Sequence, residues 1–221
     1  MFADIDAVDR FQAGETGQEL LGIMEDRGLL GLAYWHNGMK QLSANRPLLE
    51  PADAAGLKFR IQTSDVLEAQ FRALDANPQK MAFSEVYGAL QTGVVDGQEN
   101  TWSNIYTKKF FEVQDGITET NHGIIDYLVT VSAEWWNGLE PEVRDQLHGI
   151  LMEVTETRNT MSYEINQENR QKILDAGGTI RTLSDAQRAK WVEAMKPVWA
   201  QFEDDVGAAT IEAAQAANTG S

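Results

Sequence analysis

The sequence contains no cysteine among its 221 residues. Disulfides, thiolate metal sites and cysteine catalysis are therefore excluded. Basic residues are also scarce, because 18 lysines and arginines stand against 34 aspartates and glutamates, which gives a formal net charge of −16. So acidic a chain argues against nucleic acid and anionic membrane surfaces as partners. A small anionic ligand is still compatible with it, since one buried arginine sets the charge of a site locally.

Long hydrophobic runs and several familiar motifs are missing as well. No apolar run reaches the roughly 18 residues of a membrane span, so direct insertion into a membrane is not expected. The chain opens with MFADIDAVDRF and no secretion signal, which predicts either a cytoplasmic protein or a chain whose start is missing. It lacks GxGxxG, Walker and GxSxG patterns, and its histidines (His36, His122 and His148) lack metal-ligand spacing. We therefore predict neither a cofactor nor a metal.

What is present is an alternation of strand-like and helical segments. Hydrophobic residues make up 43% of the chain, enough for a packed core. The alternation predicts an α/β fold. Apolar residues at helical spacing predict a helix over 66–76 and a long one over about 141–176, whose interrupted apolar stripe indicates that it crosses from one packed body to another. Strands are expected at 29–35, 39–42, 57–62, 117–121, 124–131 and 179–183, with a turn at 36–38.

The chain is organised around residues 81–107, MAFSEVYGALQTGVVDGQENTWSNIYT. The pattern predicts a helix with Ser84 as its N-cap, then a strand that begins at Val94-Val95. The polar run 96–100 would follow the strand and open onto a crevice, where open α/β sheets bind ligands. The alternative, a βαβ unit with a solvated loop, remains open on spacing alone.

A binding site is the better-supported chemistry. Residues 57–62 alternate, so that Arg60 points away from the apolar face of its strand, either into water or into a cleft. In a cleft, its planar fork suits a carboxylate held by two parallel hydrogen bonds, and Asn100 adds a neutral donor. Phe83 and Trp102 would wall the ligand, although side chains of this kind are more often simply part of the core.

Several stretches resemble one known family. These are GLKFRIQTS (56–64), MAFSEVYGALQTGVVDGQEN (81–100), KFFEVQ (109–114) and TNHG (120–123), with AYWHNGMKQLS near the start. They are similar to the DctP-type solute receptors of TRAP (tripartite ATP-independent periplasmic) transporters, across essentially the whole chain. The resemblance implies a periplasmic, two-lobed binding protein that is not an enzyme. Such a receptor closes on a small organic acid and delivers it to a membrane permease.

The resemblance also assigns roles to individual residues. Arg60 would pair with the ligand carboxylate, Asn100 would reach the ligand, Phe83 would line the pocket and His122 would lie near it. Lys40 stands where many members carry a second arginine; it keeps the charge but loses the two-pronged fork.

The start of the chain departs from the family pattern, because members carry a signal and a βαβαβ half-lobe before the point where Met1 falls. We therefore expect an N-terminally truncated first lobe, with unpaired edges on the strands 29–35 and 124–131. Lobe 1 would comprise 1–37 and 124–165, and lobe 2 would comprise 38–123 and 166–221. Two alternatives stay open: an α/β enzyme that uses His122 as an acid-base group on an organic acid, and a truncated pseudoreceptor that binds nothing.

Overall fold

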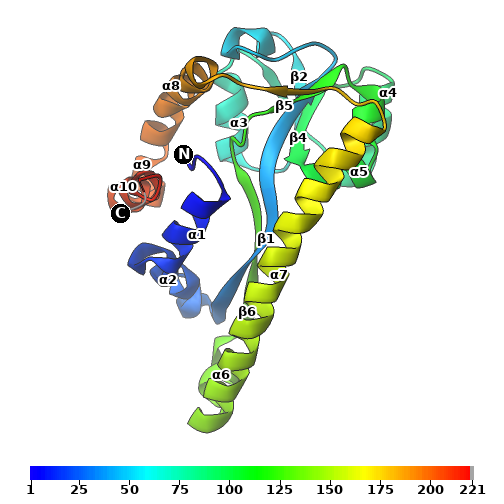
Figure 1. Ribbon diagram of the computed structural model, residues 1–221. Helices are drawn as coiled ribbons and strands as arrows, with labels where there is room; N and C mark the ends of the chain where they lie inside the picture. Colours follow the sequence, from blue (N-terminus) through cyan, green and yellow to red (C-terminus); the bar gives the residue numbers. More distant parts are fainter. Residues whose placement is uncertain (220–221) are drawn as a thin grey trace.

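The computed structural model describes residues 1–219 and confirms an α/β architecture (Figure 1). Its seven-stranded mixed sheet has the order β3-β2-β4-β1-β5-β7, with β6 paired to β1 outside this path. The strands are β1 (Leu29–Ala44), β2 (Lys58–Ile61), β3 (Asn77–Lys80), β4 (Gly97–Thr101), β5 (Gly116–Glu119), β6 (Ile124–Ser132) and β7 (Ile180–Thr182). The α-helices are α1 (Ile5–Ala13), α2 (Glu15–Gly22), α3 (Asp65–Arg72), α4 (Val86–Gln91), α5 (Trp102–Thr107), α6 (Ala133–Asn137), α7 (Pro141–Asp175), α8 (Asp185–Gln201), α9 (Glu203–Val206) and α10 (Ala208–Ala216).

Strand β1 connects two regions of the molecule (Figure 1). Its first part pairs antiparallel with β6, and its last residues pair with β4 and β5. The two strands expected to carry unpaired edges pair with each other along one edge, and among residues 1–219 the other edge of each has no strand partner. Helix α7 is 35 residues long and packs against β1 and α5, as expected for a helix that spans two bodies. Within residues 1–219, no helix has the length and apolar character needed to cross a membrane.

The turn expected at 36–38 is wrong, because β1 continues through it. The register against β6 shifts between His36 and Gly38, which is a β-bulge rather than a reversal of the chain. Gly38 has a φ of 146°, and a Cβ atom there would lie 2.7 Å from Nδ2 of Asn166 on α7. Glycine is thus needed because the long helix passes so close to the strand.

The stretch 81–107 also folds differently from the prediction. Ser84 caps no helix, and the segment that contains it is a short 3-10 turn, Phe83–Glu85. Val94 is exposed, and the strand of this stretch is β4, formed by the polar residues that were expected to follow it as a loop. Every residue of β4 is buried. Part of this polarity is satisfied, since Gln98 Nε2 donates to Ser43 Oγ at 2.9 Å, while Oε1 of Gln98 is buried without a hydrogen-bond partner in the described part of the chain.

The sheet separates two cores. Leu42, Phe59, Phe71 and Trp191 pack where α3 and α8 lie, whereas Val86, Trp102, Phe110 and Ile173 pack where α4, α5 and α7 lie. The lobe boundaries remain a prediction. The C-terminal stretch reaches across the predicted division, because Arg10 Nε on α1 donates to the carbonyl oxygen of Ala217 at 2.8 Å.

Candidate functional site

Arg60 lies near the end of β2 and is 3% exposed, so its placement in water is wrong. Its Nε and Nη2 donate to the carbonyl oxygen of Met81 at 3.0 and 2.8 Å, which fixes the plane of the guanidinium. Burial lowers the pKa of Arg60, and the Glu99 charge acts in the opposite direction. Arginine nevertheless stays protonated in proteins. Within residues 1–219, no carboxylate lies within ion-pair distance of it, so this buried charge lacks a direct counter-ion.

Asn100 lies on the same side of the sheet as Arg60. The strand β2 runs parallel to β4 with Arg60 opposite Gln98, and side chains two residues apart on a strand share a face. Oδ1 of Asn100 accepts hydrogen bonds from Asn104 Nδ2 at 2.6 Å and from the backbone N–H of Thr101 at 3.2 Å. The acceptor atom is thus satisfied, which leaves the Nδ2 of Asn100 as the group that can donate.

Phe83 adjoins Arg60 from the 3-10 turn that follows β3. The Cζ atom of Arg60 lies 5.7 Å from the centroid of the Phe83 ring, and Nζ of Lys108 lies 5.5 Å from the same centroid. Phe110 contacts the ring edge-on, with 5.8 Å between centroids. The structure therefore brings Phe83 and Arg60 together, and it adds Lys108, a cation that the sequence pattern did not indicate.

Lys40 and His122 converge on Glu99 instead. Oε2 of Glu99 lies 2.5 Å from Lys40 Nζ and 2.9 Å from His122 Nε2, and His122 Nδ1 lies 2.7 Å from Thr120 Oγ1. Burial by itself raises the pKa of Glu99, but the Lys40 charge and the His122 hydrogen bond outweigh it and lower the pKa to about 2. Burial also lowers the pKa of His122. Lys40 and Glu99 thus form a buried, mutually neutralised ion pair.

Trp102 occupies a different environment. It is 4% exposed at the start of α5, and Cζ of Arg170 lies 5.6 Å from its ring centroid. It lines a polar cavity beside β1 and α7, and neither Arg60 nor Phe83 is among the residues that line this cavity. The surroundings of Trp102 therefore fit a core position better than a wall of the site at Arg60.

Sequence reasoning missed a third buried charge, His36, which was interpreted as part of a turn. Its Nδ1 lies 2.7 Å from Asp126 Oδ1 and its Nε2 lies 2.7 Å from Asp9 Oδ1. Burial by itself lowers the pKa of His36, but the hydrogen bonds to Asp126 and Asp9 outweigh it and raise the pKa to about 9. The cluster ties α1 to β1 and β6. No sequence spacing links these three residues, which are brought together only by strand pairing and helix packing.

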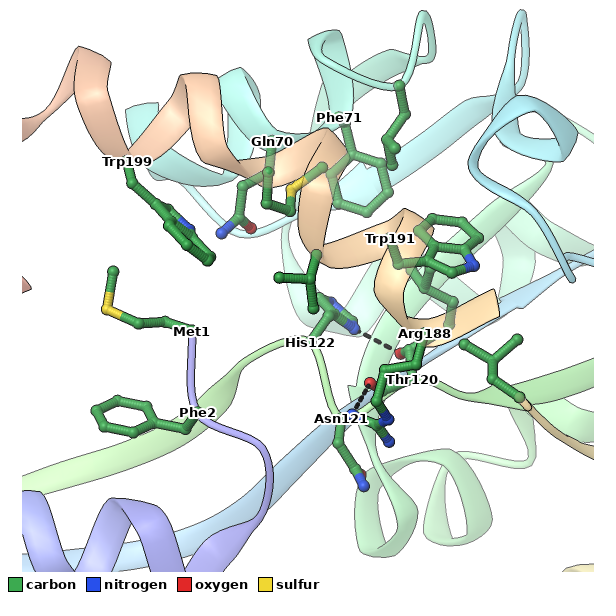
Figure 2. Close-up of a pocket in the computed structure, with 15 residues that line it drawn as sticks. Met1, Phe2, Gln70, Phe71, Thr120, Asn121, His122, Arg188, Trp191 and Trp199 are labelled. Atoms are coloured by element: carbon green, nitrogen blue, oxygen red, sulfur yellow. Dashed lines mark hydrogen bonds between the residues drawn. The ribbon is translucent and has the colours of Figure 1, made fainter. Parts of the chain in front are cut away.

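A mostly apolar cavity lies on the Lys40–Glu99 side of the sheet (Figure 2). Thr120, His122 and Arg188 form its polar end, and Trp191 and Trp199 of α8 form part of its wall. His122 thus contributes to both the Glu99 network and this cavity. Arg188 is the other functional candidate that sequence reasoning missed, since nothing around it in the sequence distinguishes it from an ordinary helix-surface cation.

Comparison with known proteins connects this geometry to a single family. Residues 1–205 match the family described as DctP, bacterial extracellular solute-binding protein, family 7. The chain is 62% identical over 218 residues to the C4-dicarboxylate-binding periplasmic protein DctP of Vibrio cholerae, covering 99% of this chain and 66% of the relative. It is 47% identical over 218 residues to the protein of the same name from Rhodobacter capsulatus, covering 98% and 66%. The chain therefore spans slightly less than two thirds of these relatives.

Solved structures show the same likeness. A TRAP periplasmic solute-binding protein from Shewanella oneidensis, solved with bound succinate, is 53% identical with a TM-score of 0.92, covering 99% of this chain and 72% of that one. A TRAP periplasmic solute-binding protein from Pseudomonas aeruginosa, solved with bound L-malate, is 45% identical with a TM-score of 0.84, covering 91% and 70%. The two-lobed binding-protein fold implied by the sequence resemblance is thereby confirmed.

Proposed function

The chain belongs to the DctP family of bacterial extracellular solute-binding proteins, and from that premise we propose that it binds a C4-dicarboxylate through Arg60. Two of its relatives carry C4-dicarboxylate binding in their names, and two similar structures hold succinate and L-malate. The ligand class proposed for this chain is therefore a four-carbon diacid such as these.

The observation that carries the proposal is the state of Arg60. Its guanidinium is buried, its plane is fixed by the Met81 carbonyl group, and no carboxylate of residues 1–219 neutralises it. A buried charge is costly unless it is paired. A ligand carboxylate supplies the missing counter-ion, and the charge-assisted hydrogen bonds that it accepts are among the strongest in proteins.

The other site residues either contact the ligand or support the residues that do. Asn100 donates to the ligand through Nδ2, and Phe83 covers one side of the site beside the guanidinium. Lys40 and His122 hold Glu99 in place, so we assign them a positioning role. Trp102 supports the packing of α5 against α7.

The wider assignment follows from the family. We infer that the chain acts as a receptor without catalytic activity, that it works in the periplasm, and that it delivers its ligand to the membrane permease of a TRAP transporter. Closure of the two lobes around the hinge formed by β1, β6 and α7 would bury the bound acid. These inferences rest on family membership, because the chain spans only part of its relatives.

Calorimetric titration of the chain with succinate, L-malate and propionate tests the proposal. We expect one equivalent of each diacid to bind and propionate to bind more weakly. Because binding to the native state alone stabilises it, succinate at about 100 times its Kd should raise the free energy of unfolding by roughly 2.7 kcal/mol. Absence of both heat and stabilisation would contradict the proposal, and NMR detection of a product from either acid would favour an enzyme.

A further inference from the structure

The cavity of Figure 2 combines an apolar interior with two cations, the Arg188 guanidinium and the α-ammonium group of Met1. Burial and the Arg188 charge lower the pKa of the Met1 ammonium group. Leu42, Phe71, Leu74, Trp191 and Met195 are among the apolar residues that line it. Its polar end comprises Thr120, His122 and Arg188. Apolar walls with a few convergent polar groups are typical of small-molecule sites.

Arg188 is not accounted for by the contacts of the fold. It is half-buried, and its one hydrogen bond from the side chain is a long one, from Nη1 to the carbonyl oxygen of Thr120 at 3.4 Å. Within residues 1–219 it forms no ion pair, although the chain carries 34 acidic residues. It also lies in the first turn of α8, where the helix dipole disfavours a positive charge. Its position therefore weakens the helix rather than strengthening it.

The size of the cavity limits the occupant. Its volume is about 60 Å³, and a single water molecule needs about 10–15 Å³ by the same measure. The space thus suits about four to six non-hydrogen atoms. A C4-dicarboxylate has about eight non-hydrogen atoms, so the space excludes it by size.

We propose that this cavity is a second binding site, specific for short-chain monocarboxylates, in which Arg188 binds the carboxylate and the apolar walls bind the hydrocarbon. Butyrate, with six non-hydrogen atoms, is the matching probe. The site is separate from the one at Arg60, because Arg60, Phe83 and Asn100 do not line the cavity. Size distinguishes its ligand from a C4-dicarboxylate, which has more non-hydrogen atoms than the cavity holds.

The test is a butyrate titration by calorimetry and by saturation-transfer NMR, performed with saturating succinate present so that the site at Arg60 is filled. We expect wild-type protein to bind butyrate and not butyramide, which has the same shape without the charge. Arg188→Gln should weaken butyrate binding at least about tenfold. Lys190→Gln is the matched control, since it removes the same charge two residues away, where Lys190 is 61% exposed and pairs with Glu50; it should leave butyrate binding unchanged.

A second variant keeps the test independent of Arg188. Val192 lines the cavity and is 40% exposed, so that Val192→Trp should fill the space without disturbing the core. We expect this variant to lose butyrate and to keep succinate. Equal binding of butyrate by wild type and Arg188→Gln would overturn the proposal, as would equal binding of butyramide. The proposal would also be overturned if Arg60→Gln lost butyrate binding and Arg188→Gln kept it, because butyrate would then occupy the site at Arg60. A failure of succinate to bind would count only against the proposed function.

Discussion

Arg60 and Lys40 are two buried cations on the two strands that flank β4, and they differ in what neutralises them. Lys40 lies 2.5 Å from a carboxylate oxygen of Glu99, which also contacts His122. Arg60 donates only to a backbone carbonyl group and has no carboxylate of residues 1–219 within ion-pair distance. Two cations with similar burial and equal charge therefore have different roles, and the presence or absence of a counter-ion distinguishes them. The compensated cation holds the structure together, and the uncompensated one is available to a ligand.

The largest effect should come from removing the compensated cation. Lys40→Met leaves the Glu99 carboxylate buried without its counter-ion, and breaking a buried ion pair typically costs about 3–5 kcal/mol. Urea unfolding of the variant should show a loss of that size. Lys40→Met combined with Glu99→Gln should recover most of it, because the stranded charge is then gone. Equal stability of Lys40→Met and wild type would show that the pair is not structural.

His36 tests whether a third buried cation behaves as Lys40 does. Its pKa of about 9 lies above the ordinary value of 6.5, and a shift of this size corresponds to up to about 3 kcal/mol. Because the folded-state pKa is the higher one, this stabilisation is fully present below pH 6.5 and is lost as the pH rises through 9. The free energy of unfolding, measured by urea between pH 6 and 10, should fall accordingly in the wild type.

The control for that pH series is His36→Gln, which cannot titrate. Its stability should change less between pH 6.5 and 9.5 than that of the wild type, and α1 should be held more loosely throughout. Parallel pH profiles of the two proteins would contradict the role assigned to the contacts of His36 with Asp9 and Asp126.

Removing the uncompensated cation should affect binding rather than folding. Arg60→Gln deletes a charged hydrogen-bond donor worth about 1.5–3 kcal/mol, so succinate should bind about ten- to 150-fold more weakly in calorimetry. Arg72→Gln is the matched control, because Arg72 is 66% exposed and contacts only the surface residue Glu68 among its acidic neighbours. If Arg60→Gln binds succinate with full affinity, the proposed difference in role between Arg60 and Lys40 is contradicted.

The smallest effect should come from Asn100, which contributes a neutral donor. Asn100→Ala should weaken succinate binding by about 0.5–1.5 kcal/mol. Asn104→Ala separates direct from indirect effects, since Asn104 only orients the Asn100 amide by donating to its Oδ1 atom. A larger loss in Asn104→Ala than in Asn100→Ala would indicate that the amide is structural.

The sequence predicts the α/β class, the long α7 helix and the polar face of β2 because these depend on local periodicity. It does not predict β4 as a strand, since GQENT contains none of the apolar residues typical of a buried strand and is stabilised by distant partners such as Ser43 and Lys40. For the same reason, the pairing of Lys40 with Glu99 is invisible in the sequence, because the two residues meet only when β1 and β4 pair.

The bulge at His36 shows the limit of turn signals. Asn37 and Gly38 are typical turn residues, yet they lie inside a 16-residue strand. Gly38 is needed there for the close approach of Asn166 on α7, which is 128 residues further along the chain and beyond the reach of any local pattern. The structure places Phe83 beside Arg60 and Asn100 on the same side of the sheet, whereas Trp102 lines a different cavity. Their roles toward a ligand stay predictions.

The most direct test of the contrast between the two cations is ¹⁵N NMR of the Arg60 guanidinium and the Lys40 ammonium group during a succinate titration, with Arg60→Lys and Lys40→Met used to assign the signals. We predict that the Arg60 signals shift with saturation at one equivalent while the Lys40 signal stays essentially in place. A shift confined to Lys40, or none at Arg60 under conditions where calorimetry shows binding, would contradict the account.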